Sequence, residues 1–272
     1  MCVHTASELW GKGVLQMISR RSALSWLGVS AGGAGALTAF SGFAKMRPAN
    51  GTRVIACERF CATDLGQVHL RSYIADVLFP CMDQLHNGPR VSLEAIVAPH
   101  TPETLVLAVY PSFDEMLEAR TRVSSDPRVR RAWAGLESVQ ALDDVRSHVL
   151  LASEESVRIP EAPSYVNSSL FEVRTWHAAA WRESPPTEVN SVLSRNGIHP
   201  IVGGATAAGE HVPRFTYVVP FESFAARQKA WTGLEADARW MEMQRESIAE
   251  FGSGARTTAK AIYRLAPNSP SA

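Results

Sequence analysis

The sequence predicts an α+β protein in which two tandem ferredoxin-like units form an α+β barrel. The first observation is a repeated junction, in which a β-rich run is broken by a proline and followed by Ser-Phe and a helical segment. The two copies span residues 104–113 and 215–224, at a constant offset of about 111 residues. The second observation is the element order β-α-β-β-α-β in each half, which is the split βαβ pattern of ferredoxin-like units. Together they favour duplication of a whole supersecondary unit.

The first half is expected to contain four strands joined by helices. β-Branched, aromatic or alternating apolar residues mark the strands, which cover residues 53–61, 91–98, 104–110 and 148–152. A helix from about residue 63 to residue 86 joins the first two strands. Ser112, with Glu115 three residues later, forms a capping box that begins the next helix. Asp126, followed by a proline at the first helical position, begins a further helical turn.

The second half has the same order with a shorter first helix. Its strands are expected over residues 170–176, 198–206, 214–219 and 259–265. A short helix is expected over residues 187–195, and a single longer helix from Ser223 to about Phe251. Two such sheets can close face to face, with helices outside and a cavity between the sheets. The chain then divides into a signal peptide (residues 1–44), a first unit (45–160) and a second unit (161–272).

The N-terminal segment is typical of a twin-arginine export signal. Arg20 and Arg21 stand in the run Ser-Arg-Arg-Ser-Ala-Leu, and a moderately apolar stretch rich in Gly and Ala follows. Small residues up to Ala44 predict cleavage after that residue and a periplasmic or secreted location. An uncleaved membrane anchor is the alternative, although the stretch is weakly apolar for a stable span. Translation from Met17 instead of Met1 would leave a compact signal.

Charge and cysteine content narrow the class of protein. Lys and Arg together number 27, as do Asp and Glu, and this near-zero net charge argues against a nucleic-acid partner. The four cysteines form no zinc-binding pattern. On one strand, Cys57 and Cys61 would lie about 13 Å apart, whereas a disulfide needs Cα atoms within about 7 Å. Cys81 could pair with either one if the fold brings them together.

Several landmarks resemble the NIPSNAP family of the dimeric α+β barrel superfamily. Residues 171–176, Phe-Glu-Val-Arg-Thr-Trp, look like the opening strand of that family. Its later landmarks are similar to residues 112–113, 126–129, 223–224 and 237–240 of this chain. Ala238 stands where the family usually has proline. The resemblance covers most of residues 52–267 and implies the barrel fold, but no shared chemistry.

Strand parity predicts a set of ligand-binding residues. If residues 55–60 align with residues 171–176, Ile55 and Cys57 lie on one face, which is expected to be covered by helices. The other face, expected to line the barrel interior, carries Glu58, Phe60, Glu172, Arg174 and Trp176. An arginine there could hold a ligand carboxylate through two hydrogen bonds. The alternative is an internal Glu–Arg pair that keeps the two sheets in register.

His199 and Tyr217 complete the candidate set, and His177 is considered beside His199. His199 lies near a strand end, as does His177, and either could serve in acid–base chemistry at the cavity mouth. Tyr217 lies on a hairpin strand. A packing or surface role is the alternative for all three. No histidine pair has metal-ligand spacing, so no metal site is expected, and neither a phosphate-binding glycine motif nor a nucleophile elbow is present.

The leading hypothesis is an exported NIPSNAP-like barrel that binds a small organic ligand between its sheets. One alternative, which rests on resemblance alone, is an enzyme of the same barrel class, such as a cofactor-independent oxygenase or a haem-handling protein. The other is an assembly protein, in which an aromatic- and Met-rich helix forms a homo-oligomer interface. The expected partners are the organic ligand and the twin-arginine export machinery. The cofactor and the substrate stay unspecified.

Overall fold

The computed structural model describes residues 51–85, 88–159, 170–177, 187–209, 214–267 and 269. The expected export signal and its cleavage point after Ala44 lie outside these residues. Residues 160–169, which link the two halves, also lie outside the described residues. The boundary between the units at residue 160 therefore stays a prediction. No helix in the described part of the chain is long and apolar enough to cross a membrane.

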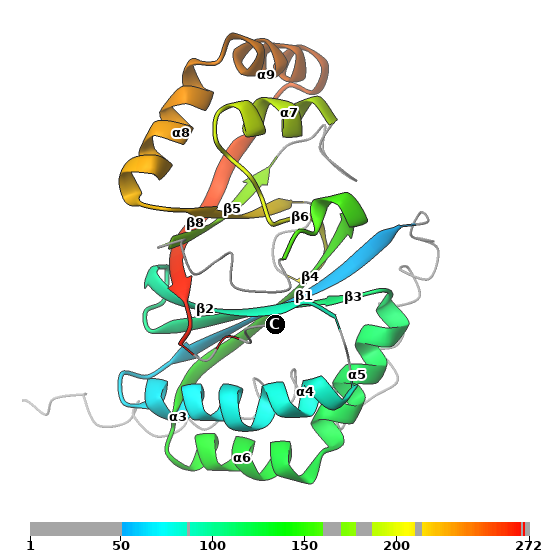
Figure 1. The fold of residues 1–272 in the computed structure, drawn as a ribbon, viewed down its shortest axis with the longest axis vertical. Helices are drawn as coiled ribbons and strands as arrows, with labels where there is room; N and C mark the ends of the chain where they lie inside the picture. Colours follow the sequence, from blue (N-terminus) through cyan, green and yellow to red (C-terminus); the bar gives the residue numbers. More distant parts are fainter. Residues whose placement is uncertain are drawn as a thin grey trace, which may run out of the picture. The chain divides into compact units, whose positions relative to one another are not determined.

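The described residues form eight strands. These are β1 (Thr52–Ala62), β2 (Arg90–Val97), β3 (Glu103–Tyr110), β4 (Leu142–Ser153), β5 (Leu170–His177), β6 (Val202–Ala208), β7 (Phe215–Phe221) and β8 (Arg256–Leu265). Helices connect them on the outside of the sheets (Figure 1). They are α3 (Gly66–Ser72), the π-helical η2 (Tyr73–Leu78), α4 (Phe79–Leu85), α5 (Phe113–Ser125), α6 (Pro127–Ser138), the 3₁₀ turn η3 (Glu154–Ser156), α7 (Thr187–Arg195), α8 (Phe224–Ala236) and α9 (Ala238–Phe251).

The strands close into a barrel in the order β1-β3-β2-β8-β5-β7-β6-β4. Each half contributes four consecutive strands of this ring, in the order expected of a ferredoxin-like unit, and the neighbouring strands are antiparallel. The halves meet along two seams, where β2 pairs with β8 and β4 pairs with β6. The predicted α+β barrel is therefore confirmed. Its origin by duplication stays a prediction, because shared element order does not establish descent.

Side-chain caps begin four of the described helices, and three of them start helices at the residues where the sequence predicts a start. The Ser112 hydroxyl accepts a hydrogen bond from the Glu115 amide at 3.2 Å, as the capping box predicts. Ser223 accepts one from the Ala226 amide at 3.1 Å. Asp126 caps α6 through the Arg128 amide, with a proline at the start of the helix. Ser112 and Ser223 fix the points at which the two β-rich runs turn into helices, whereas Asp126 separates α5 from α6.

Several predicted elements differ from the structure: β6 begins at Val202 rather than at residue 198, and the helix expected over residues 63–86 includes the π-helical η2. The single helix expected over residues 223–251 is two helices, because Asp237 has extended backbone (φ −69°, ψ 121°). Its carboxylate accepts hydrogen bonds from the amides of Arg239 and Trp240, which makes it the cap of α9. Strand β4 begins at Leu142 rather than at His148, because residues 142–147 continue the ladder with β1. The longer strand places Arg146 in the barrel wall.

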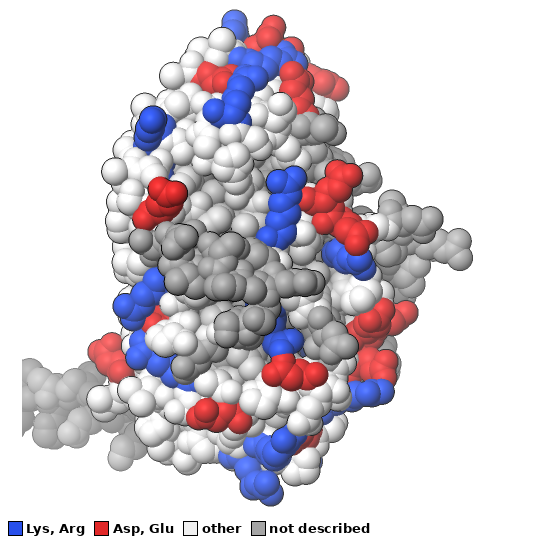
Figure 2. All heavy atoms as spheres, in the orientation of Figure 1, with Lys and Arg blue, Asp and Glu red and all other residues white. Residues whose placement is uncertain are grey.

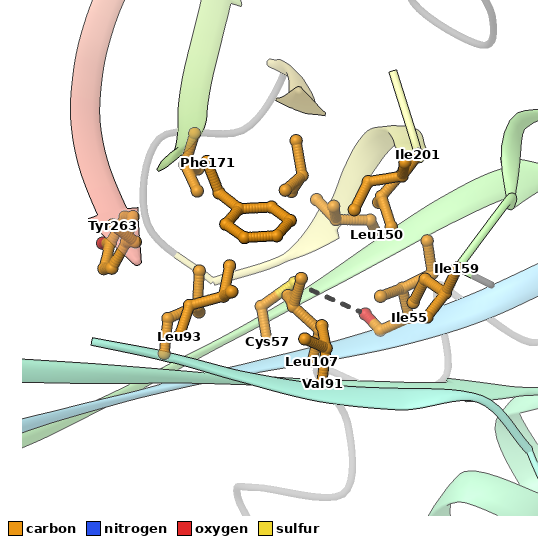
Figure 3. Close-up of a cluster of buried hydrophobic side chains, with 14 of the residues drawn as sticks. Ile55, Cys57, Val91, Leu93, Leu107, Leu150, Ile159, Phe171, Ile201 and Tyr263 are labelled. Atoms are coloured by element: carbon orange, nitrogen blue, oxygen red, sulfur yellow. Dashed lines mark hydrogen bonds between the residues drawn. The ribbon is translucent and has the colours of Figure 1, made fainter. Parts of the chain in front are cut away.

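Two apolar cores lie on the two faces of the sheet. Inside the barrel, side chains of both halves point toward one another, among them Cys57, Leu107 and Leu150 of the first half and Phe171 of the second (Figure 3). The second core lies under the helices of the second half and contains Trp176, Tyr217, Trp231 and Trp240. Both faces of the sheet are thus buried.

The predicted inside and outside faces are exchanged. Ile55, Cys57, Phe171 and Val173 share a face as expected, but that face lines the barrel interior. The opposite face, with Glu58, Phe60, Glu172, Arg174 and Trp176, lies under helices, since Arg120 of α5 reaches Glu58 and Arg227 of α8 reaches Glu172. Charged groups are tolerated there because the helices supply their counter-charges. The alternation of side chains along a strand could not show which of two buried faces points into the barrel.

Glycine allows close approach at the β4–β6 seam. A Cβ atom on Gly204 would lie 2.9 Å from the Leu150 Cβ and 2.9 Å from the Leu151 carbonyl oxygen. On Gly209, which has a positive φ of 111°, it would lie 2.6 Å from the Cβ of His148. The seam that joins the two halves therefore depends on residues without side chains.

The cysteines of the described residues are all free. Cys57, Cys61 and Cys81 are buried, and none forms a disulfide. Burial raises the pKa of Cys57 to about 12 and that of Cys61 to about 12, so both thiols are protonated at neutral pH.

Candidate functional site

Two predicted site residues of the second half, Glu172 and Arg174, belong to a closed ion-pair network. Glu172 is 0% exposed, and its carboxylate accepts hydrogen bonds from Arg174 Nε at 2.8 Å, Arg227 Nε at 2.7 Å and Trp231 Nε1 at 2.7 Å. The Arg174 guanidinium also lies 3.4 Å from the centroid of the Trp231 ring. Because protein donors reach both carboxylate oxygens, the network is complete without a ligand. This geometry matches the alternative of an internal Glu–Arg pair.

Of the other predicted residues, Trp176 and Tyr217 pack together, whereas Glu58, Phe60 and His199 lie elsewhere. Trp176 packs against Trp240 at 5.3 Å and against Tyr217 at 6.1 Å between ring centroids. Burial raises the pKa of Tyr217. Glu58 pairs with Arg120, and Phe60 is fully buried in the first half. His199 is exposed in the loop before β6. The ligand-binding role assigned to these seven residues stays a prediction, and the structure does not gather them into one cavity.

A different cavity lies at one end of the barrel, where polar side chains replace the apolar core. Its volume is about 80 Å³. It is lined by Arg59, Arg146, Ser147, His148, Thr175, Thr206, Arg214, Thr216 and Ala259, and we call these nine residues the polar mouth. They come from β1, β4, β5, β6 and β8, and from β7 with the residue before it. Both halves of the barrel therefore build the site.

Strand register explains why these side chains converge. Arg59 continues the inward alternation of Ile55 and Cys57 along β1. It lies directly opposite Arg146 in the β1–β4 ladder. In the second half, Thr175 lies opposite Ala259 on one side and opposite Thr216 on the other. The Thr175 and Thr216 hydroxyls are 3.1 Å apart and share a hydrogen bond.

The three arginines of the polar mouth have different partners. Arg146 Nε donates to the Asp144 carboxylate at 2.7 Å. Arg214 donates to the Thr258 hydroxyl at 2.9 Å. The Nε of Arg59 is buried and has no hydrogen-bond partner among the described residues. Glu103 is a buried carboxylate of β3, but its side chain accepts hydrogen bonds from the Tyr263 hydroxyl and the Cys61 thiol rather than from Arg59.

His148 is the imidazole of the polar mouth. Burial, with repulsion from the nearby Arg59 charge, lowers the pKa of His148 to about 3. The ring is therefore neutral at physiological pH, with one nitrogen that donates and one that accepts. The described residues contain no cluster of three or more His, Cys, Asp or Glu side chains that could hold a metal ion. The polar mouth is suited to hydrogen bonding and charge recognition.

The sequence reading missed this site for an identifiable reason. Arg59 has the strand parity of Ile55 and Cys57, whose face was expected to be covered by helices. Arg146 lies before the strand expected to begin at residue 148, and His148 is not among the candidate residues. A correct assignment of the inward face would have put Arg59 in the barrel next to Cys57. The partners across the barrel depend on long-range strand pairing.

Comparison with known proteins supports part of the resemblance. The NIPSNAP family model matches residues 169–270. An uncharacterized NIPSNAP domain protein from Burkholderia xenovorans is 14% identical, with a TM-score of 0.32, and the match covers 37% of this chain and 94% of that one. No curated protein matches.

Two other solved structures align with most of this chain. A heme-binding protein from Thermus thermophilus is 13% identical, with a TM-score of 0.45, and the match covers 80% of this chain and 92% of that one. A chlorite dismutase variant from Candidatus Nitrospira defluvii is 11% identical, with a TM-score of 0.45, and the match covers 84% and 96% of the two chains. The NIPSNAP match falls on the second half, whereas the polar mouth is built by both halves.

Proposed function

We propose that this protein is a small-molecule-binding barrel whose ligand enters the polar mouth. The observation that carries the proposal is the cavity of about 80 Å³, in which polar side chains of both halves converge inside a mostly apolar barrel. Binding sites are typically concave and hold a few placed polar groups against apolar walls. The polar mouth meets this description.

The size of the cavity limits what can enter. Sites for drug-sized ligands have volumes of about 300–1,000 Å³, whereas this cavity has about 80 Å³. It can hold a very small molecule, or the head group of a longer one whose remainder lies outside. A whole haem does not fit in this cavity. The haem-handling alternative therefore receives no support from the polar mouth.

The test is native mass spectrometry of protein purified from its own host. We expect a small organic molecule to remain bound to the wild type and to be lost from Ala259→Leu, because the larger side chain fills the cavity. Ala249→Leu, on an exposed position of α9, is the matched control and should retain the molecule. Equal occupancy in Ala259→Leu would exclude the polar mouth as the binding site. A Soret absorbance band in the purified protein would instead favour haem handling.

Export through the twin-arginine route is a second part of the proposal. It is supported by the twin arginines and the small residues before Lys45. N-terminal sequencing of the mature protein from the periplasmic fraction should begin at Lys45. A mature chain that retains residues 20–44, or one found only in the cytosol, would contradict cleavage and export.

A further inference from the structure

We infer that the polar mouth recognises an oxyanion head group, such as a carboxylate or a phosphate, and that Arg59 is the cation that this group neutralises. The inference rests on the proposed binding function and names the chemical class of its ligand. Of the nine residues that line the cavity, three are arginines and none is acidic. With His148 neutral, the lining carries positive charge only. A cationic ligand would find no carboxylate in this lining.

Arg59 differs from three other partly buried arginines of this protein. On the helix-covered faces, Arg174 pairs with Glu172, Arg120 with Glu58 and Arg71 with Glu94. Arg59 forms no such pair, and its buried Nε has no hydrogen-bond partner among the described residues. Withdrawing part of a guanidinium, here the Nε of Arg59, from water without a counter-charge has a free-energy cost. A bound anion would supply the missing counter-charge.

The register across β1 and β4 directs two guanidinium groups at one small space. Directly opposite residues on antiparallel strands have Cβ atoms about 4.5–5.5 Å apart, and Arg59 lies opposite Arg146. The planar fork of an arginine matches two oxygens of a carboxylate or phosphate. From the second half, the hydroxyls of Thr175, Thr206 and Thr216 line the same cavity and can donate hydrogen bonds.

Charge on the molecular surface does not account for such selectivity. On the face shown in Figure 2, acidic and basic side chains are interspersed. The net charge of the chain is near zero. Long-range attraction of anions by the whole protein is therefore weak. Selection for an anion would come from the cavity lining.

The experiment measures thermal unfolding of the purified protein at constant ionic strength. The probes are acetate, inorganic phosphate and chloride, with acetamide as a neutral molecule of nearly the same shape as acetate. We expect acetate or phosphate to raise the Tm in a saturable way, and chloride and acetamide to have no such effect. Arg59→Gln should weaken the anion response at least tenfold. Arg245→Gln, on the exposed side of α9, should leave it unchanged.

Folding of Arg59→Gln is checked by circular dichroism and by its Tm without anions, which should be no lower than that of the wild type. A wild type without a saturable anion response, or an equal response in Arg59→Gln, would overturn the inference. The proposed binding function would survive either result if native mass spectrometry still showed a molecule that Ala259→Leu loses. Conversely, an anion response that Ala259→Leu leaves intact would contradict the polar mouth as the site.

Discussion

Arg59 and Arg146 lie directly opposite each other on neighbouring strands, so two positive charges face the same small cavity. Like charges in this arrangement destabilise a sheet. Within the described part of the chain, Arg146 has a carboxylate partner, Asp144, and Arg59 has none. The chain therefore keeps an electrostatically unfavourable pair at the place where it has its polar cavity. Proteins commonly retain such strain where function requires it.

Replacement of Arg59 by an apolar residue should stabilise the anion-free protein. We expect Arg59→Met to raise the free energy of unfolding by about 1–2 kcal/mol in low-salt buffer, because it removes an unpaired, partly buried charge and a like-charge contact. Urea denaturation measures this without adding ions. Arg245→Met, at an exposed position, should change stability by less than about 0.5 kcal/mol. A less stable Arg59→Met would show that the guanidinium is well compensated in the folded state.

His148 should make stability depend on pH. Its pKa is lowered from 6.5 to about 3 in the folded protein. Between these values the unfolded chain binds a proton that the folded chain does not, so stability is complete above about pH 6.5 and falls as the pH drops toward 3. The loss attributable to this group is on the order of 2–4 kcal/mol.

Burial sets most of this response, and the charge of Arg59 on β1 adds to it. Arg146 on β4 and Arg214 before β7 line the same cavity as His148. Urea denaturation from pH 7 to pH 4 should show a shallower decline for His148→Gln than for the wild type. Arg59→Met should also reduce the slope, because the pKa of His148 then rises toward 6.5. Identical slopes in all three proteins would contradict the assignment.

The buried network around Glu172 should be intolerant of change. Glu172→Gln leaves Arg174 and Arg227 without their shared counter-charge, and breaking a buried pair in this way costs about 3–5 kcal/mol. Chemical denaturation should show the loss. Glu250→Gln, at an exposed position of α9, is the control and should be nearly neutral. A loss below about 1 kcal/mol would mean that the network is solvated.

The seam between β4 and β6 should not accept a methyl group. In Gly204→Ala the new Cβ would lie 2.9 Å from both the Leu150 Cβ and the Leu151 carbonyl oxygen, so we expect a loss of about 1–3 kcal/mol. Gly135→Ala in α6 is the matched control, because nothing lies within 4 Å of the added atom. That change should stabilise by up to about 1 kcal/mol through helix propensity. Equal effects of the two substitutions in urea denaturation would refute the seam argument.

The sequence predicted the barrel because local signals specify its elements. Ser112, Asp126 and Ser223 cap helices where the motifs placed them. Asp237 is a cap of the same kind, but the sequence pattern around it predicts an uninterrupted helix. An Asp at a cap looks like an ordinary helix residue unless its backbone conformation is known.

The functional surface was harder to predict than the fold. Parity correctly grouped Ile55 with Cys57, yet it could not say which face pointed inward, because strands buried on both faces do not show a polar side. The partners that decide the question, such as Arg120 for Glu58 and Trp231 for Glu172, come from distant segments. Convergence at the polar mouth likewise depends on register between strands of different halves.

The lining of the polar mouth is asymmetric, because one continuous chain supplies both halves of the barrel with different side chains. Opposed residues Arg59 and Arg146 in the first half correspond in position to Thr175 and Ala259 in the second. Two identical subunits would have to present the same groups on both sides, and a ligand could then enter in two equivalent poses. Here the guanidinium groups of β1 and β4 face a wall of hydroxyl groups. A bound molecule would be held in one orientation, with its two ends in chemically different surroundings.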